Sequence, residues 1–282
     1  MTLYHSSGRL RLIRRDESPI PLDLDGITPD RVATLSLLEV AKLPIYHGNR
    51  REELGLHFDI DGNPAAGWLQ IAGETSNVKC IGAGMTGGTV YIENDAGAHV
   101  GARMTGGEMI LDASAGDWLG AEMKGGSIVV RGSAGNQVGA AYRGSRRGMT
   151  GGVITILGWA GDEVGLLMRR GLIICESCGE FAGASMIAGS IFVRGKAGNR
   201  IGAGMKRGTI FAGGGVDELP PSFRHSCDYL PTFLALYFRE LAAPEVPTGT
   251  RWPEVVALSL VRCYRGDLLN GGRGEILVPV GL

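Results

Sequence analysis

Apolar side chains recur with two superimposed periods between residues 69 and 208. Over four residues at a time they alternate with polar ones, which is typical of a strand with one buried face. This alternating unit then returns about every 19 residues along the chain. The pattern predicts a series of short, equivalent strands. Their paired apolar positions are Val90 and Ile92, Met109 and Leu111, Ile128 and Val130, Ile154 and Ile156, and Ile191 and Val193.

A small-residue bend ends each predicted strand, and a Met-x-Gly-Gly phrase or a variant of it ends each repeat. In one copy Ala96-Gly97 forms the bend and Met104-Thr105-Gly106-Gly107 ends the unit. Glycine permits the backbone conformations that such bends require. A unit of 19 residues suits one coil of a parallel β-helix, whereas a propeller blade needs about 40 residues. We therefore expect a mainly β fold, a single-stranded right-handed parallel β-helix of about seven coils stacked at roughly 4.8 Å.

Methionine occupies an equivalent position in every predicted coil. Equivalent positions of neighbouring coils lie above one another in a solenoid, so these side chains are expected to form one column. A flexible thioether fills irregular gaps in a protein interior, which favours a core role. A metal-binding row of thioethers is the alternative, but no His or Cys accompanies the column. Its members are Met85, Met104, Met123, Met149, Met168, Met186 and Met205.

Residues 1–68 are expected to form an N-terminal α/β leader that covers one end of the coils. Segments 10–13 and 20–24 are strand-like, and Thr28-Pro29-Asp30 predicts a helix start. Residues 37–41 predict a short helix that ends before Pro44. Alternation resumes at residues 58–62, where we expect the stack of coils to begin. An open solenoid end exposes backbone donors and apolar interior, so it needs a cover.

A second cover is expected at the other end. Glycines 213–215 break the period, and residues 231–241 place Leu234, Tyr237, Phe238 and Leu241 on one helical face. This helix is predicted to seal the last coil, and residues 276–278 are strand-like. The expected organisation is a leader at 1–68, a glycine-repeat parallel β-helix at 69–212, and a C-terminal helical cap and tail at 213–282.

Composition narrows the possible partners and compartment. The 282 residues, 44% of them hydrophobic, can bury a sizeable core. A net charge of -1 provides no global basic field to recruit nucleic acid. The first residues lack an apolar run of signal-peptide length, and no apolar cluster approaches the length of a membrane span. We expect a soluble, cytoplasmic protein that binds neither nucleic acid nor membranes.

No catalytic constellation emerges from the motifs. Cys175 and Cys178 match C-x-x-C, but Cys175 falls at an inward-facing repeat position and no second pair completes a metal site. The Gly-rich stretch at residues 82–87 matches G-x-G-x-x-G, yet it belongs to a recurring bend rather than a strand-to-helix turn. The histidines His5, His47, His57, His99 and His225 show no metal-ligand spacing. We therefore expect neither a catalytic residue nor a metal ligand.

Basic side chains crowd the later coils. Arg169 and Lys206 directly follow a column methionine, and Arg143, Arg146 and Arg147 lie in an insertion. Like charges at that spacing repel by roughly 1 kcal/mol per pair even in water, so counter-charges are expected. One interpretation is a solvated edge that pairs with acids of a neighbouring subunit, and the other is an anionic-ligand track. The candidate residues are Arg143, Arg146, Arg147, Arg169, Arg170, Lys206 and Arg207.

The repeated Gly-x-x-x-Gly-x-x-Met-x-Gly-Gly phrase resembles the glycine-repeat β-helix of two families. These are the C-terminal domain of the glutamate synthase large subunit and the C subunit of formylmethanofuran dehydrogenase. The resemblance to the second family covers nearly the whole chain. It includes Gly48-Asn49 and residues 54–58 of the leader, the coils, and the tail residues 263–267 and 271–276.

The resemblance to the dehydrogenase C subunit implies a non-catalytic structural subunit of a complex in one-carbon metabolism. In the bacterial type, formyl passes from formyl-tetrahydromethanopterin to methanofuran or methylofuran and is hydrolysed to formate. Implied partners are a formyltransferase subunit, a metal-dependent hydrolase-like subunit and a further subunit. The coenzyme has a glutamate-containing tail, which the seven basic residues would hold unless they contact an acidic partner surface. The resemblance implies no cofactor bound by catalytic residues of this chain.

Other classes remain open. In the archaeal type, the partners carry a molybdenum or tungsten pterin and iron-sulfur clusters. Arginine greatly outnumbers lysine, a bias common in GC-rich genomes, and this favours the bacterial formyltransferase/hydrolase type. A glutamate-synthase-like β-helix protein would need amidotransferase partners. An independent binding module would be monomeric when purified alone, whereas a structural subunit would co-purify with larger chains.

Overall fold

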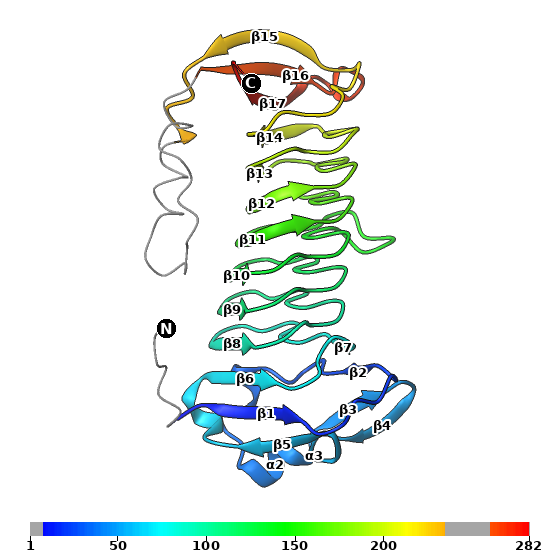
Figure 1. Cartoon of the computed structure of the whole chain (residues 1–282), viewed down its shortest axis with the longest axis vertical. Coiled ribbons are helices and arrows are strands. Elements are labelled where there is room, and N and C mark those ends of the chain that lie inside the picture. Colours follow the sequence, from blue (N-terminus) through cyan, green and yellow to red (C-terminus); the bar gives the residue numbers. More distant parts are fainter. Residues whose placement is uncertain (1–7, 235–259, 282) are drawn as a thin grey trace.

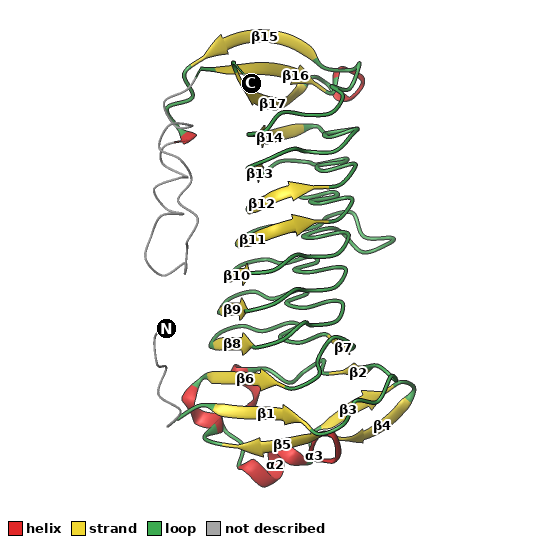
Figure 2. Cartoon of the chain, viewed as in Figure 1, coloured by secondary structure: helices red, strands yellow, loops and turns green. Residues whose placement is uncertain are grey.

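The computed structural model describes residues 8–234 and 260–281. The chain is mainly β, as the alternation predicts, with one 13-stranded sheet and one 4-stranded sheet. Figure 1 shows an elongated molecule in which coils stack between the leader and the C-terminal strands. Figure 2 shows that the helices gather mainly at the leader end, while the coils consist of short strands joined by loops.

The repeats supply consecutive parallel strands of the large sheet. Each residue pairs with its equivalent in the next coil, for example Val90 with Met109 and Met109 with Ile128. The predicted equivalence of the strands is therefore confirmed. The strands are β6 (Trp68–Ala72), β8 (Thr89–Ile92), β9 (Glu108–Leu111), β10 (Ser127–Val130), β11 (Val153–Ala160), β12 (Leu172–Cys178), β13 (Ser190–Val193) and β14 (Arg207–Ala212).

The methionines form the predicted column, and all seven are fully buried. The N–H after one methionine donates to the carbonyl of the methionine in the preceding coil, as from Thr105 to Met85 and from Lys124 to Met104, both at 2.8 Å. Met85 also packs against the second glycine of the next coil, since a Cβ on Gly107 would lie 2.8 Å from its Cε. The thioethers therefore fill the interior, as a core role requires.

The leader continues the large sheet instead of only covering it. Its first strand pairs in parallel with β6 on one side and antiparallel with a second leader strand on the other. Leader side chains such as Leu10, Leu22 and Phe58 share one hydrophobic core with Leu69 of the first coil. The leader elements are β1 (Leu10–Arg14), β2 (Leu22–Asp23), α1 (Pro29–Val32), α2 (Leu37–Ala41), β3 (Pro44–His47), β4 (Arg50–Glu53), α3 (Leu54–His57), β5 (Phe58–Asp61) and η1 (Pro64–Ala66).

Two leader predictions have different outcomes. The helix at residues 37–41 is confirmed as α2, and Ser36 and Glu39 form a reciprocal capping box at its start. The expectation that the coils begin at residues 58–62 is wrong, because β5 lies at the edge of the sheet and runs antiparallel to β1. Alternation identifies a strand but does not choose its partner. The small sheet, ordered β4-β3-β2-β7, joins the leader to the first coil through β7 (Val78–Lys79).

C-terminal strands continue the large sheet beyond the last repeat. β17 (Arg273–Pro279) pairs in parallel with β14, so that Gly274 aligns with Gly208 and Ile276 with Ile210. Two antiparallel strands follow outward, β16 (Val261–Gly266) and β15 (Arg224–Tyr229), with η2 (Leu268–Asn270) between β16 and β17. The predicted strand at 276–278 is confirmed. The predicted helix at 231–241 lies outside the described residues from position 235 onward.

Candidate functional site

A row of cations follows the methionine column on the outside of the coils. The N–H of Arg169 donates to the carbonyl of Met149 at 2.9 Å, and that of Lys206 donates to Met186 at 2.8 Å. These bonds place both residues directly after a column methionine, two coils apart. With a coil rise of roughly 4.8 Å, their backbones are separated by about 10 Å. Lys124 occupies the same position in an earlier coil, where its N–H donates to Met104.

A second cation accompanies each of these two. Arg170 follows Arg169, and Arg207 opens β14 after Lys206. In the last parallel strand pair, between β14 and β17, Arg207 aligns with Arg273. We call Lys124, Arg169, Arg170, Lys206, Arg207 and Arg273 the basic row. Arg273 was missed by sequence reasoning, because its alignment with Arg207 requires β17 to return beside β14. A signal was present in the sequence. Arg273-Gly274-Glu275-Ile276 repeats the pattern of Arg207-Gly208-Thr209-Ile210.

The basic row differs in charge pairing from other cations on the coils. Arg131 pairs with Asp112, Arg194 with Glu176 and Arg200 with Glu180, each at 2.7–2.9 Å from a carboxylate of the preceding coil. Within residues 8–234 and 260–281, no member of the basic row has a carboxylate at salt-bridge distance. The row therefore carries positive charge that no carboxylate of the described residues pairs with.

The insertion forms a loop of residues 141–148 that leaves the coils and returns beside Leu167. The N–H of Gly148 donates to the carbonyl of Leu167 at 3.0 Å. Tyr142 anchors the loop, because its ring stacks on Trp118 with centroids 4.9 Å apart and its hydroxyl lies 3.0 Å from Nδ1 of His99. Beyond this anchor Arg143, Arg146 and Arg147 are exposed.

Burial of the aromatic anchor affects its titratable groups. Burial raises the pKa of Tyr142 to about 12, so its hydroxyl stays protonated near neutral pH. Burial, followed by the nearby charge of Lys79, lowers the pKa of His99. A neutral imidazole accepts a hydrogen bond from a phenol, which suits the contact between the two side chains. The anchor thus holds the loop without a net charge.

The structure divides the seven predicted basic residues into two groups. Arg169, Arg170, Lys206 and Arg207 lie in the basic row, just before or at the start of β12 and β14. The loop of residues 141–148 projects from the opposite edge, away from where β11 and β12 begin (Figure 1). The seven residues therefore do not form one continuous group on the surface. Periodicity fixes the positions of repeat residues, but not the direction in which an insertion leaves the repeat.

The cysteine pair lies in the core. Cys175 is 1% and Cys178 is 5% exposed, and Cys178 takes the place that alanine holds in neighbouring coils, where it bridges to Ala197. The hydrogen bond to Cys178, and then burial, raise the pKa of the Cys175 thiol well above its usual value. A protonated, buried thiol behaves as a small hydrophobe.

Two of the histidines, whose spacing in the sequence suggests no metal site, come together in the structure. The rings of His47 and His57 lie 4.7 Å apart between centroids, and both approach the carboxylate of Glu52. Sequence reasoning missed this cluster because the contact depends on how the β3–β4 hairpin folds onto α3.

Within the described part of the chain, every helix is too short or too polar to cross a lipid bilayer.

The chain is similar to subunits of formyltransferase/hydrolase and formylmethanofuran dehydrogenase complexes. No family model matches the chain. A chain of the crystallised formyltransferase/hydrolase complex from Methylorubrum extorquens, in complex with methylofuran, matches with a TM-score of 0.88 and 34% sequence identity. That match covers 96% of this chain and 99% of the other.

Curated relatives match over a shorter stretch. The C subunit of the molybdenum-containing formylmethanofuran dehydrogenase 1 of Methanothermobacter thermautotrophicus is 42% identical over 87 residues, which is 30% of this chain and 22% of the relative. The C subunit of the tungsten-containing formylmethanofuran dehydrogenase 2 of the same organism is 37% identical over 93 residues, 32% of this chain and 34% of the relative. The chain thus spans about a fifth to a third of the length of these relatives.

Proposed function

The chain belongs to the family that comprises the C subunits of formylmethanofuran dehydrogenases and of the formyltransferase/hydrolase complex, and on this premise we propose that it is the non-catalytic structural subunit of a formyltransferase/hydrolase complex. The complex would convert formyl-tetrahydromethanopterin to formate through formylmethanofuran or formylmethylofuran. The other subunits would carry the chemistry, and this chain would hold them in place.

One observation carries the proposal. The similarity to the formyltransferase/hydrolase chain extends over 96% of this chain, so it includes the leader and the C-terminal strands as well as the repeats. Repeats alone would support only a fold, since function depends on sites added to a fold. The proposal includes a division of the chain into three parts. These are a leader at residues 1–68, a right-handed parallel β-helix at 69–212 and a C-terminal cap at 213–282.

The architecture suits a scaffold. Each coil contacts only its neighbours, and the stack gains rigidity from continuous backbone ladders and one apolar interior. A stiff, elongated body offers several faces on which different subunits can dock. The interior is filled by side chains such as Ile128, Val130 and Met123, all fully buried, which leaves the outer surface to carry recognition.

The basic row is the proposed contact for negative charge. Exposed guanidinium and ammonium groups without internal counter-ions attract carboxylates, and Arg binds them in a bidentate geometry. A methylofuran-type coenzyme with a glutamate tail, or an acidic surface of another subunit, would supply these carboxylates. The exposed arginines of the loop at residues 141–148 form a separate contact for an acidic group.

The C subunit of a molybdenum or tungsten formylmethanofuran dehydrogenase is the second candidate function. The curated relatives of this type support it. Their matches cover about a third of this chain or less, whereas the match to the formyltransferase/hydrolase chain covers nearly all of it. Structural similarity that includes the leader and the C-terminal strands favours the first proposal.

Purification of the complex from the native host tests the proposal. We expect the tagged chain to co-purify with a formyltransferase subunit and a hydrolase-like subunit, at a fixed stoichiometry by native mass spectrometry. Recovery of the chain alone as a monomer would contradict a structural role. Recovery with subunits that contain a molybdenum or tungsten pterin would favour the dehydrogenase instead.

A further inference from the structure

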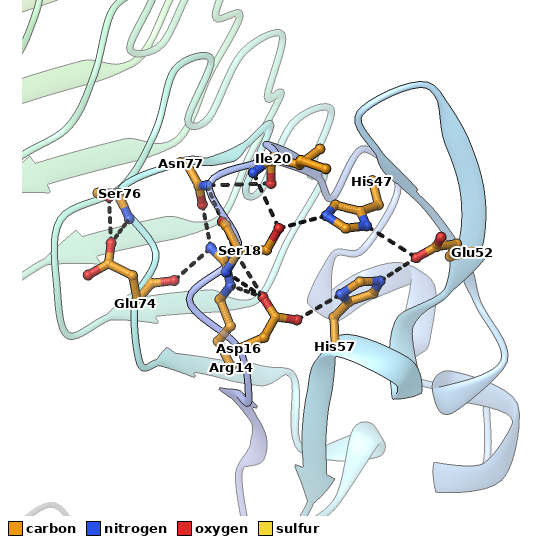
Figure 3. A network of polar contacts seen from close by, with 10 residues as sticks. All are labelled: Arg14, Asp16, Ser18, Ile20, His47, Glu52, His57, Glu74, Ser76 and Asn77. Carbon is orange, nitrogen blue, oxygen red and sulfur yellow. Dashed lines mark hydrogen bonds and ion pairs between the residues drawn. The ribbon is translucent and has the colours of Figure 1, made fainter.

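The leader contains a cluster of imidazoles and carboxylates apart from the basic row. His47 ends β3, Glu52 lies on β4 and His57 ends α3, so three consecutive elements each contribute one side chain. Figure 3 shows the two imidazoles turned toward the same Glu52 carboxylate. His57 is 6% exposed, while His47 and Glu52 are partly exposed. The cluster therefore has a buried side and an open side.

One nitrogen of each imidazole faces a single carboxylate oxygen. Nε2 of His57 lies 2.6 Å from Oε2 of Glu52, and Nδ1 of His47 lies 3.4 Å from the same oxygen. The three potential ligand atoms all lie within 4.8 Å of one another. Ligands about 2.0–2.1 Å from a tetrahedral zinc ion are separated by about 3.3 Å. To reach that spacing, Nε2 of His57 has to move away from Oε2 of Glu52, since the two atoms lie 2.6 Å apart.

The other nitrogen of each imidazole is held by a polar group. Nδ1 of His57 lies 3.0 Å from Oδ2 of Asp16, and Nε2 of His47 lies 3.1 Å from Oγ of Ser18. A histidine that binds a metal almost always donates its second N–H to such a group, which fixes the ring and its tautomer. Both rings therefore have the orientation that a metal requires, with the outer nitrogens occupied and the inner ones converging.

The supporting carboxylate is itself fixed. Asp16 accepts hydrogen bonds from the N–H of Ser18 and from the buried guanidinium of Arg14, both at 3.1 Å. Burial raises the pKa of Asp16, but the bonds from His57, Ser18 and Arg14 outweigh this and lower it to about 2. Arg14 also donates to the carbonyl of Glu74 at 2.8 Å, and to Asn77 in the first coil. The support of the cluster thus reaches into the coils.

We propose that His47, Glu52 and His57 bind one divalent first-row transition-metal ion, with zinc the best fit, and that a solvent molecule completes its coordination. Two imidazoles and one carboxylate form a ligand set that binds such ions in preference to calcium or magnesium, which favour oxygen ligands. The ion would join the end of the β3–β4 hairpin to α3. This site lies in the leader and does not depend on the proposed function of the whole chain.

Hydrogen bonding alone is the competing explanation. His57 can bridge Asp16 and Glu52, and His47 can donate from Nδ1 to Glu52 while its Nε2 accepts from the Ser18 hydroxyl. A bound cation would instead explain why both imidazoles converge on one carboxylate oxygen. Metal titration separates these two explanations.

Metal titration of the chelator-treated full-length chain, without an affinity tag, tests the proposal. A Cys227→Ser background removes an exposed thiol, because cysteine thiolates are zinc ligands in their own right. By isothermal titration calorimetry we expect about one equivalent of zinc to bind. Glu52→Gln or His47→Gln should weaken binding at least 100-fold, and Asp16→Asn, which removes the carboxylate that supports His57 and pairs with Arg14, by about 10–100-fold. His225→Gln on β15 is the matched control and should leave affinity unchanged.

Cobalt substitution gives a readout that needs no variant of the cluster. We expect cobalt bound to the Cys227→Ser chain to show the intense visible bands of a four- or five-coordinate ion, and zinc to remove them. Absence of stoichiometric uptake, a six-coordinate spectrum like that of aqueous cobalt, or binding that survives both His47→Gln and Glu52→Gln would each overturn the proposal. Uptake abolished by His225→Gln would do the same.

Discussion

The second glycine of each Met-x-Gly-Gly phrase allows neighbouring coils to approach closely. At Gly126, where φ is +88°, an added Cβ would lie 2.6 Å from the carbonyl oxygen of Gly107 and 2.7 Å from Cε of Met104. The position therefore excludes a side chain both by backbone conformation and by contact. The same relation recurs as far as Gly274, whose Cβ would lie 2.6 Å from Cε of Met205.

Substitution of Gly126 by alanine should destabilise the chain strongly. Left-handed strain costs about 1–2 kcal/mol and overpacking adds about 1–3 kcal/mol, so we expect a loss of about 2–5 kcal/mol. The change is measured as a shift of the urea midpoint by circular dichroism. Gly84→Ala separates the two causes, because φ is +69° there but nothing lies within 4 Å of an added Cβ. Equal losses for both variants would show that the close approach has no energetic effect.

Among the elements, the loop of residues 141–148 depends on a single aromatic anchor. Tyr142 contributes ring stacking on Trp118, a hydrogen bond with His99, and a backbone N–H that donates to Glu122 at 3.3 Å. The side chains of the three arginines beyond it form no ion pair within the described residues. Removal of the ring should therefore release the loop while the coils stay intact.

Tyr142→Ala should expose the loop to trypsin, which cleaves after arginine. Loss of the partly buried, stacked ring costs about 2 kcal/mol, which corresponds to about a 30-fold increase in local opening. The rate of cleavage at Arg143, Arg146 and Arg147, followed by mass spectrometry, should rise by about that factor. Tyr142→Phe keeps the ring and loses only a hydrogen bond of about 1 kcal/mol, so a smaller, few-fold increase is expected. An unchanged cleavage rate in Tyr142→Ala would show that Tyr142 does not anchor the loop.

Local periodicity predicted the repeated elements well, because each coil position meets the same neighbours. Val90, Met109 and Ile128 could be aligned from their spacing alone, and so could the methionine column. The partners of β5 and β17 could not be predicted this way, since strand pairing between distant segments leaves no periodic signal. The alignment of Gly274 with Gly208 is visible in the sequence only after the strand order is known.

For the whole molecule, the sequence predicted the kind of surface but not its layout. Arg169 and Lys206 could be placed in one row because both follow a column methionine. Arg146 and Arg147 could not be placed in this way, because residues of an insertion have no equivalent position in the other coils. The pair His47 and His57 was missed for a related reason. These residues are brought together by the hairpin and α3, whose packing is set by tertiary contacts.

Charge reversal tests whether the two basic groups act in binding. We expect Arg169→Glu with Arg170→Glu, and separately Arg146→Glu with Arg147→Glu, to weaken coenzyme affinity or assembly of the purified complex by about tenfold or more. Each reversal turns attraction for carboxylates into repulsion. Since the groups lie on different edges, one coenzyme tail is not expected to need both. Affinity is measured by calorimetry, and assembly by native mass spectrometry.

The effect of charge reversal should shrink at high ionic strength, because exposed charges are screened. Arg224→Glu on β15 is a control at an exposed cation outside both groups. If neither double variant changed affinity or assembly, the basic residues would be ordinary solvated surface. A loss of similar size in Arg224→Glu would indicate a general charge effect.

The pairing of β17 with β14 has a consequence for biosynthesis. A ribosome delivers β14 well before β17, so the nascent protein carries an unpaired strand edge while the intervening residues are still being made. Such an edge invites pairing with other polypeptides. Maturation of this end therefore has to wait for the late arrival of β17, and premature termination upstream of Arg273 would leave a product prone to aggregate.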